Sequence, residues 1–145
     1  MSADFVEPLN DLVGSRFYAV EFILDYLRLQ FDGPQGLEHH EITVEVDPRI
    51  RVSDQWFEWG KPGFRDALCD QFGAIVHQAR TDIEGEQILI EFDNGALISI
   101  PLRIENFVGP EAADYAHSIG QERPVGALWR TDWKDDWQRL YTAKQ

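Results

Sequence analysis

A short phrase that occurs twice constrains the fold of this chain more than any other feature of its sequence. Residues 27–37 read LRLQFDGPQGL, and residues 88–97 read ILIEFDNGAL. In both copies apolar residues alternate with other residues before Phe-Asp, and a glycine and a leucine follow. Alternation with a period of two is typical of half-buried strands, and Asn-Gly is typical of a tight turn between antiparallel strands. The phrase therefore predicts two strand–turn–strand units.

Each copy of the phrase lies within a longer segment that reads as three strands. The first segment, about residues 14–47, follows Gly14 and ends with ITVEV; the second, about residues 73–104, follows Gly73 and ends with ISIPLRI. We interpret both as three-stranded antiparallel β-meanders. They are either a duplication or two unrelated units with the same order of strands and turns.

The segment between the meanders has the pattern of a short helix. Phe64, Leu68 and Phe72 recur at four-residue spacing, and Gly73 follows as a stop. This spacing places the apolar side chains on one helical face, and glycine is the usual residue after a helix end. The sequence predicts a helix over about residues 62–72.

Helices are also predicted for the C-terminal region, about residues 110–145. Pro110 and Glu111 suit a helix start. The tail TDWKDDWQRLYTAKQ would place Trp133 and Trp137 on one helical face, with Trp129 one turn before. The predicted fold class is thus α+β, a single domain over residues 1–145 with two meanders, a mid-chain helix and C-terminal helices. Whether the strands form one sheet, two sheets or a partial barrel stays open.

The composition and net charge limit which classes of function the sequence favours. The net charge of −13, from 26 acidic and 13 basic residues, disfavours nucleic-acid binding, which depends on Lys and Arg at phosphates. It favours either electrostatic steering toward a basic partner or solubility alone. A single cysteine, Cys69, excludes an internal disulfide, and no signal peptide or membrane-spanning run is evident. We expect a cytoplasmic protein without membrane association.

Two groups of aromatic residues are the predicted partner-binding sites. One lies in SDQWFEWGKPG and comprises Asp54, Trp56, Phe57, Glu58 and Trp59. The other is the tail stripe with Trp129, Trp133 and Trp137. Trp and Tyr are enriched at interface hot spots. The alternatives are a loop folded over the core and a terminal helix docked on the sheet.

The sequence predicts no catalytic residue, no metal site and no cofactor. A set drawn from His39 or His40, His77, His117 and Glu111 is conceivable, but adjacent strand residues point to opposite faces, and no motif with metal-ligand spacing occurs. Glu111, Asp114 and Tyr115 are the candidate ligand-binding residues, in a pocket between the meanders.

Several stretches together resemble short bacterial proteins of a domain-of-unknown-function type. They are GSRFYAVEFILDYLRLQFDG, FRDALCDQFGAIV, ILIEFDNGALISIPL and GPEAADY, which span about residues 12–115. The resemblance implies no activity and no catalytic residues. In size and charge the chain is also similar to immunity proteins, which neutralise toxin domains.

Three function classes follow from these observations. The first is a protein-binding module, immunity-like or regulatory, whose acidic surface docks a basic partner. The second is a small-molecule or metal-binding protein, possibly an enzyme, although an enzyme is the less favoured class. The third is a homo-oligomeric structural protein. The sequence does not identify the partner, the substrate, the pathway or the oligomeric state.

Overall fold

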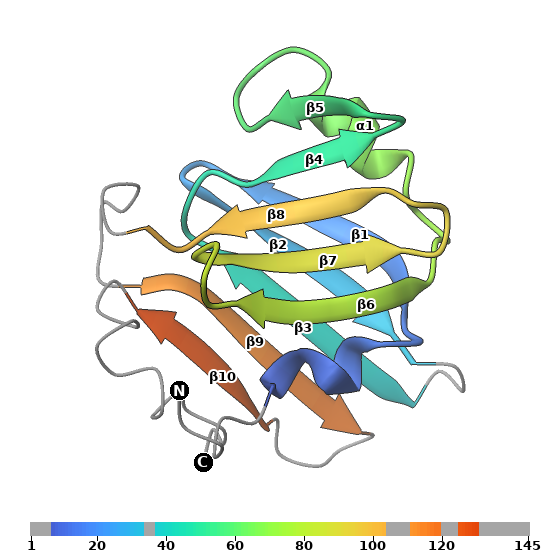
Figure 1. The fold of residues 1–145 in the computed structure, drawn as a ribbon. Helices are drawn as coiled ribbons and strands as arrows, with labels where there is room; N and C mark the ends of the chain where they lie inside the picture. Colours follow the sequence, from blue (N-terminus) through green and yellow to red (C-terminus); the bar gives the residue numbers. More distant parts are fainter. Residues whose placement is uncertain (1–6, 34–36, 104–110, 120–124, 131–145) are drawn as a thin grey trace.

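The fold is a sandwich of two antiparallel β-sheets (Figure 1). The computed structural model describes residues 7–33, 37–103, 111–119 and 125–130. Within these ranges it has ten strands, one α-helix and one 3-10 helix. The predicted α+β class is therefore wrong, because the described chain is mostly β and the strands predicted as meanders are joined by two further hairpins.

The first sheet has the strand order β1-β2-β3-β9-β10. Its strands are β1 (Arg16–Ile23), β2 (Tyr26–Asp32), β3 (Glu38–Val44), β9 (Glu111–Ile119) and β10 (Val125–Arg130). The second sheet has the order β5-β4-β8-β7-β6. Its strands are β4 (Arg49–Val52), β5 (Gln55–Glu58), β6 (Val76–Asp82), β7 (Gln87–Phe92) and β8 (Leu97–Pro101).

The two predicted meanders are present, one in each sheet. Strands β1, β2 and β3 pair in succession, as do β6, β7 and β8. The repeated phrase forms the central strand of each meander, and Phe31 and Phe92 at its ends are buried. The first strands match in detail, since both pairings are interrupted by a bulge, after Phe17 in β1 and after Val76 in β6. The two halves of the chain are thus built alike.

Backbone hydrogen bonds join the two meanders reciprocally where β1 and β6 begin. Gly14 N–H donates to the carbonyl of Val76 at 2.9 Å, and Gly73 N–H donates to the carbonyl of Phe17 at 2.8 Å. A second exchanged pair of hydrogen bonds links the same segments. Such mutual exchange, in which each unit makes the same contact to the other, is expected of two units related by a two-fold axis.

The hairpins are exchanged between the sheets. Hairpin β4–β5 follows β3 in the chain but pairs with β8 of the second sheet. Hairpin β9–β10 follows β8 but pairs with β3 of the first sheet. The first of these hairpins lies where the sequence suggested a polar loop, and its turn is formed by Ser53 and Asp54, both with positive φ.

The helix predictions were partly wrong. Helix α1 (Phe64–Cys69) lies within the predicted range of 62–72 but is shorter. The segment expected to start a helix at Pro110 and Glu111 forms β9 instead, and β10 follows. Its three alanines favour a helix, but pairing with β3 and β10 on both sides decides the structure. Trp133 and Trp137 lie outside the described residues.

A 3-10 helix, η1 (Pro8–Leu12), closes one side of the sandwich against β6. Its Leu9 and Leu12 are fully buried. The Glu7 carboxylate fastens this helix, because it accepts hydrogen bonds from the N–H of Leu9 and from the N–H and hydroxyl of Thr81. Burial raises the pKa of the Glu7 carboxyl. Asp11 of η1 lies 3.6 Å from His117 near the end of β9.

The reciprocal hydrogen bonds where β1 and β6 begin, which we call the seam, predict similar losses of stability from two substitutions. Gly14 has φ +89° and Gly73 has φ +94°, and a Cβ at either position would meet no other atom within 4 Å. Gly14→Ala and Gly73→Ala should therefore each lower the free energy of unfolding by about 1–2 kcal/mol through backbone strain alone. Urea denaturation of the two variants measures this.

Asp54→Gly provides a control of opposite sign. Asp54 already holds φ 65°, so glycine should leave stability unchanged or raise it slightly. Strongly unequal losses for the two glycine variants would contradict equivalence of the two halves.

Candidate metal centre

His39 and His40 are adjacent on β3, and the strand directs them to opposite faces of the first sheet. His39 is on the outer face, where its Nδ1 lies 3.3 Å from the Tyr18 hydroxyl. His40 is on the inner face and fully buried. The two histidines therefore have different surroundings, and they cannot serve the same ligand.

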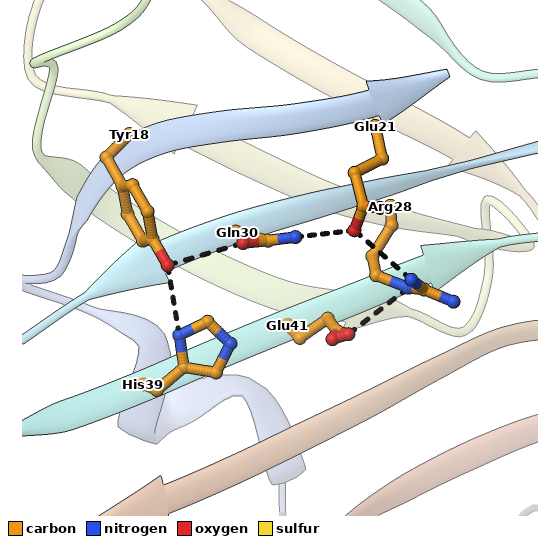
Figure 2. A network of polar contacts seen from close by, with 6 residues as sticks. All are labelled: Tyr18, Glu21, Arg28, Gln30, His39 and Glu41. Carbon is orange, nitrogen blue, oxygen red and sulfur yellow. Dashed lines mark hydrogen bonds and ion pairs between the residues drawn. The ribbon is translucent and has the colours of Figure 1, made fainter. Parts of the chain in front are cut away.

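The outer surroundings form a connected polar network (Figure 2). The Tyr18 hydroxyl lies 3.3 Å from Gln30 Oε1, and Gln30 in turn donates to Glu21 at 2.7 Å. Arg28 lies between two carboxylates, 3.1 Å from Glu21 and 3.2 Å from Glu41. Every side chain in Figure 2 is thus held by a protein neighbour.

The inner surroundings bring two imidazoles together. His40 on β3 lies directly opposite His117 on β9. Their rings stack with centroids 4.1 Å apart and an interplanar angle of 15°. Tyr115 lies two residues before His117 on β9, and its hydroxyl lies 2.8 Å from His40 Nδ1. Residues from two distant parts of the chain therefore form one buried aromatic cluster with several nitrogen atoms.

Two carboxylates approach this cluster from the surface. Glu38 Oε2 lies 3.6 Å from His40 Nε2, and Asp11 Oδ2 of η1 lies 3.6 Å from His117 Nδ1. One ligand atom each of Glu38, His40 and His117 falls within a group whose members are all within 4.8 Å of one another. A nitrogen atom of each imidazole and an oxygen atom of Glu38 thus face the same small region. Asp11 contacts His117 but is not a member of this group.

Three of the four ring nitrogen atoms of His40 and His117 lack a hydrogen bond within the described residues. His40 Nε2 and both ring nitrogens of His117 are buried, and none has a hydrogen-bond partner among the described residues. An unsatisfied buried polar group costs about 1–3 kcal/mol. A cation at this point would accept one lone pair from each ring.

The protonation states suit a cation. Burial, together with the adjacent His117, lowers the pKa of His40 from 6.5 to about 4, so its ring is neutral at pH 7. Burial likewise raises the pKa of the Tyr115 hydroxyl, which keeps its proton. Neutral imidazole is the form that binds metal ions.

The second half of the chain shows what the fold itself requires at this position. His40 pairs with Phe31 of the first copy of the phrase, and Ala96 accepts a hydrogen bond from Phe92 N–H of the second copy. Ala96 is therefore the counterpart of His40. Continuing the β4–β8 register by one residue places Val52 beside Ala96, where the first sheet has His117 beside His40.

Apolar residues thus occupy the equivalent inner positions of the second sheet. The counterpart of Tyr115, by the same registers, is Ile50, which is fully buried. The sandwich can form around Ala, Val and Ile at these places. The histidines and the tyrosine are consequently not demanded by the architecture, which favours a binding role for them.

The predicted partner-binding residues of the first aromatic group lie on β5 and its flanks. Trp56 is 39% exposed on the outer face, whereas Phe57 and Trp59 pack against the core. Asp54 and Glu58 are exposed. The guanidinium of Arg49 lies 4.2 Å from the centroid of the Trp56 ring, and that of Arg51 lies 5.8 Å from it. Trp56 is therefore flanked by cations as well as by acids.

The other predicted residues divide between the two faces of the first sheet. Tyr115 belongs to the buried cluster, whereas Asp114 next to it faces outward. For Glu111 only the backbone is described. Trp129 on β10 is fully buried and donates to the Thr81 hydroxyl, so it is a core residue.

Sequence reasoning missed the grouping of this site. His40 and His117 were both considered, but with His77, which lies on β6, and with Glu111. The carboxylates that approach are those of Glu38 and Asp11. Glu38 could have been found from strand periodicity, since it shares a face with His40. Asp11 could not, because it depends on the packing of η1.

Comparisons with family models, with curated proteins and with solved structures found no match for this chain. Among the described residues no helix is long and apolar enough to cross a membrane.

The buried cluster predicts a pH-dependent stability of the metal-free protein. Between pH 6.5 and 4 an unfolded His40 binds a proton and the folded one does not, so the free energy of unfolding falls as the pH is lowered through this range. From pH 7 to pH 5 the loss from this group should be about 2 kcal/mol. Urea denaturation in EDTA measures it.

A matched pair of variants isolates the contribution of the buried ring. His40→Leu should lose this part of the pH dependence, whereas His39→Gln on the outer face should keep it. Titratable groups away from the cluster are the same in all three proteins, so their contributions cancel in the comparison. The same slope in His40→Leu as in the wild type would contradict the assignment.

Proposed function

We propose that this protein binds a divalent transition-metal ion, with Zn²⁺ as the best-fitting ion. The observation that carries the proposal is the pair of buried, stacked imidazoles, each with a nitrogen atom within 4.8 Å of a Glu38 carboxylate oxygen and without a hydrogen-bond partner among the described residues. Imidazole nitrogen and carboxylate oxygen are common zinc ligands. Imidazole also suits Cu, Fe and Ni, whereas Ca²⁺ and Mg²⁺ prefer oxygen ligands alone.

Tyr115 sets the direction of His40 toward the ion. When Nδ1–H donates to the Tyr115 oxygen, Nε2 carries the lone pair and faces Glu38. Metal-binding histidines usually donate their second ring nitrogen in this way, which fixes both tautomer and orientation. Tyr115 is thus a positioning residue and not a ligand.

The carboxylates supply the charge and the route of entry. Glu38 has 37% of its side chain exposed and Asp11 has 65%, whereas the imidazoles are buried. An ion would meet the carboxylates first and the nitrogen atoms afterwards. Asp11 either orients His117 through Nδ1 or completes the coordination from η1.

Binding requires the ligand atoms to approach one another. They are spread over as much as 4.8 Å, whereas ligands about 2.0 Å from a tetrahedral ion lie about 3.3 Å apart. Glu38 and Asp11 are the side chains with room to move, and a tilt of the two stacked rings would aim their lone pairs at a common point. We expect binding to order these side chains without changing the sheet register.

Calorimetric titration of the EDTA-treated, desalted protein with Zn²⁺ at pH 7.5 tests the proposal. One ion per chain should bind and raise the melting temperature, since a ligand at 100 times its Kd stabilises by about 2.7 kcal/mol. His40→Leu and His117→Val, which put apolar residues in place of the imidazoles, should each weaken binding at least tenfold.

His39→Gln and His77→Gln are the matched controls, because these histidines lie outside the cluster. Both should bind Zn²⁺ like the wild type. Absence of binding heat in the wild-type protein would refute the proposal. Equal weakening in the control variants would show that zinc binds nonspecifically to surface histidines.

A further inference from the structure

Some of the described basic side chains of this acidic protein form ion pairs with carboxylates, and others do not. Arg16, Arg28, Arg80 and Arg103 each lie within 4.0 Å of a carboxylate. The other basic side chains that the structure describes have no carboxylate at that distance within the described ranges. They are Arg49, Arg51, Lys61 and Arg65.

These four cations share one end of the sandwich, which we call the basic end. Arg49 and Arg51 lie on β4, Lys61 follows β5, and Arg65 lies on α1. Figure 1 shows β4, β5 and α1 together at this end. Acidic residues outnumber basic ones two to one in the chain, yet in residues 49–69 the four basic residues outnumber the three acidic ones, Asp54, Glu58 and Asp66. Unpaired positive charge is therefore concentrated at one place.

Aromatic rings hold three of the four cations. Arg49 and Arg51 lie over the Trp56 ring, and the Arg65 guanidinium lies 4.7 Å from the centroid of Phe22. A cation against a ring face keeps its positive charge and is held in place. These guanidiniums are thus positioned without being neutralised, and their hydrogen-bond donors remain available to an anion.

A cleft of about 540 Å³ opens at this end beside Lys61 and Arg65. Trp59 forms part of its wall, stacked on Phe22 with ring centroids 6.2 Å apart. Leu24, in the turn between β1 and β2, also lines the cleft and is 92% exposed. The cleft thus combines two cations with apolar surface, and Asp66 is its one acidic lining residue.

We propose that the cleft at the basic end binds an acidic polypeptide segment. The carboxylates of the segment pair with Lys61 and Arg65, and one apolar side chain lies between Trp59 and Leu24. Arg49 and Arg51 extend the positive field to the outer face of the β4–β5 hairpin. This surface is separate from the histidine cluster and does not depend on metal binding.

Charge complementarity favours an acidic partner in spite of the net charge of −13. At about 0.1 M salt, charges more than about 10 Å apart are largely screened, so a ligand in the cleft responds mainly to the nearby cations. Apolar surface beside the cations further favours a segment that carries both carboxylates and an apolar side chain over a simple anion.

Fluorescence anisotropy with a dye-labelled peptide of four glutamates around one leucine tests the proposal at 0.1 M NaCl. The wild-type protein should bind this peptide and should not bind the same peptide with glutamine in place of glutamate. The double variant Lys61→Glu, Arg65→Glu should weaken binding at least tenfold. Leu24→Ser, at a side chain exposed enough to leave folding intact, should weaken it about threefold.

The double variant Arg16→Glu, Arg103→Glu is the control, since it changes the net charge equally but lies outside the cleft. It should bind like the wild type, and circular dichroism verifies that every variant is folded. Absence of binding to the wild-type protein would overturn the proposal. So would an equal loss in the control variant, or full competition by citrate at the same carboxylate concentration, which would show that any anion suffices.

Discussion

The reciprocal backbone hydrogen bonds between the start of β1 and the start of β6 are the constraint on which the rest of the structure depends. They fix the two meanders relative to each other before any side chain is considered. Gly14 and Gly73 turn the chain into this seam with positive φ, and the bulges after Phe17 and Val76 follow at once. The tilted rings of Phe17, Phe31 and Phe92 then pack beneath it. With the seam in place, β3 and β8 are left as open edges, and each accepts the hairpin that follows the other.

Local patterns predicted the meanders and the short helix, and they failed where long-range pairing decides the structure. Alternation in LRLQF and ILIEF, with Asn94-Gly95, was sufficient for the central strands. The hairpin of β4 and β5 was missed because its turn uses Ser53 and Asp54 at positive φ in place of glycine. Strand β9 was mistaken for a helix because alanine favours helices and because one of its two partner strands, β3, is remote in sequence. The same non-locality hid the site: strand geometry separates His39 from His40, but only the β3–β9 register brings His117 to His40.

The two faces of β3 illustrate two ways in which polar side chains are accommodated. On the outer face, His39 has Tyr18 as a neighbour in a network of hydrogen bonds and ion pairs at the surface. On the inner face, His40 has Tyr115 on one nitrogen and an unsatisfied nitrogen on the other. In the first arrangement every side chain has a polar protein neighbour. The second leaves donor atoms buried at a cost to stability, and a bound cation would recover that cost.

The exchange of hairpins between the sheets has a consequence for how such a site can arise. Each half supplies two adjacent strands at one edge of the other half's sheet, so neither half encloses a core by itself. Two separate copies of one half could complete each other only as a symmetric pair, and every residue would then occur at both equivalent places. A histidine opposite a histidine would appear twice. Joined in a single polypeptide, the two places can diverge, and one retains alanine and valine for packing while the other carries the imidazoles. Covalent continuity therefore allows an asymmetric centre within a nearly symmetric framework.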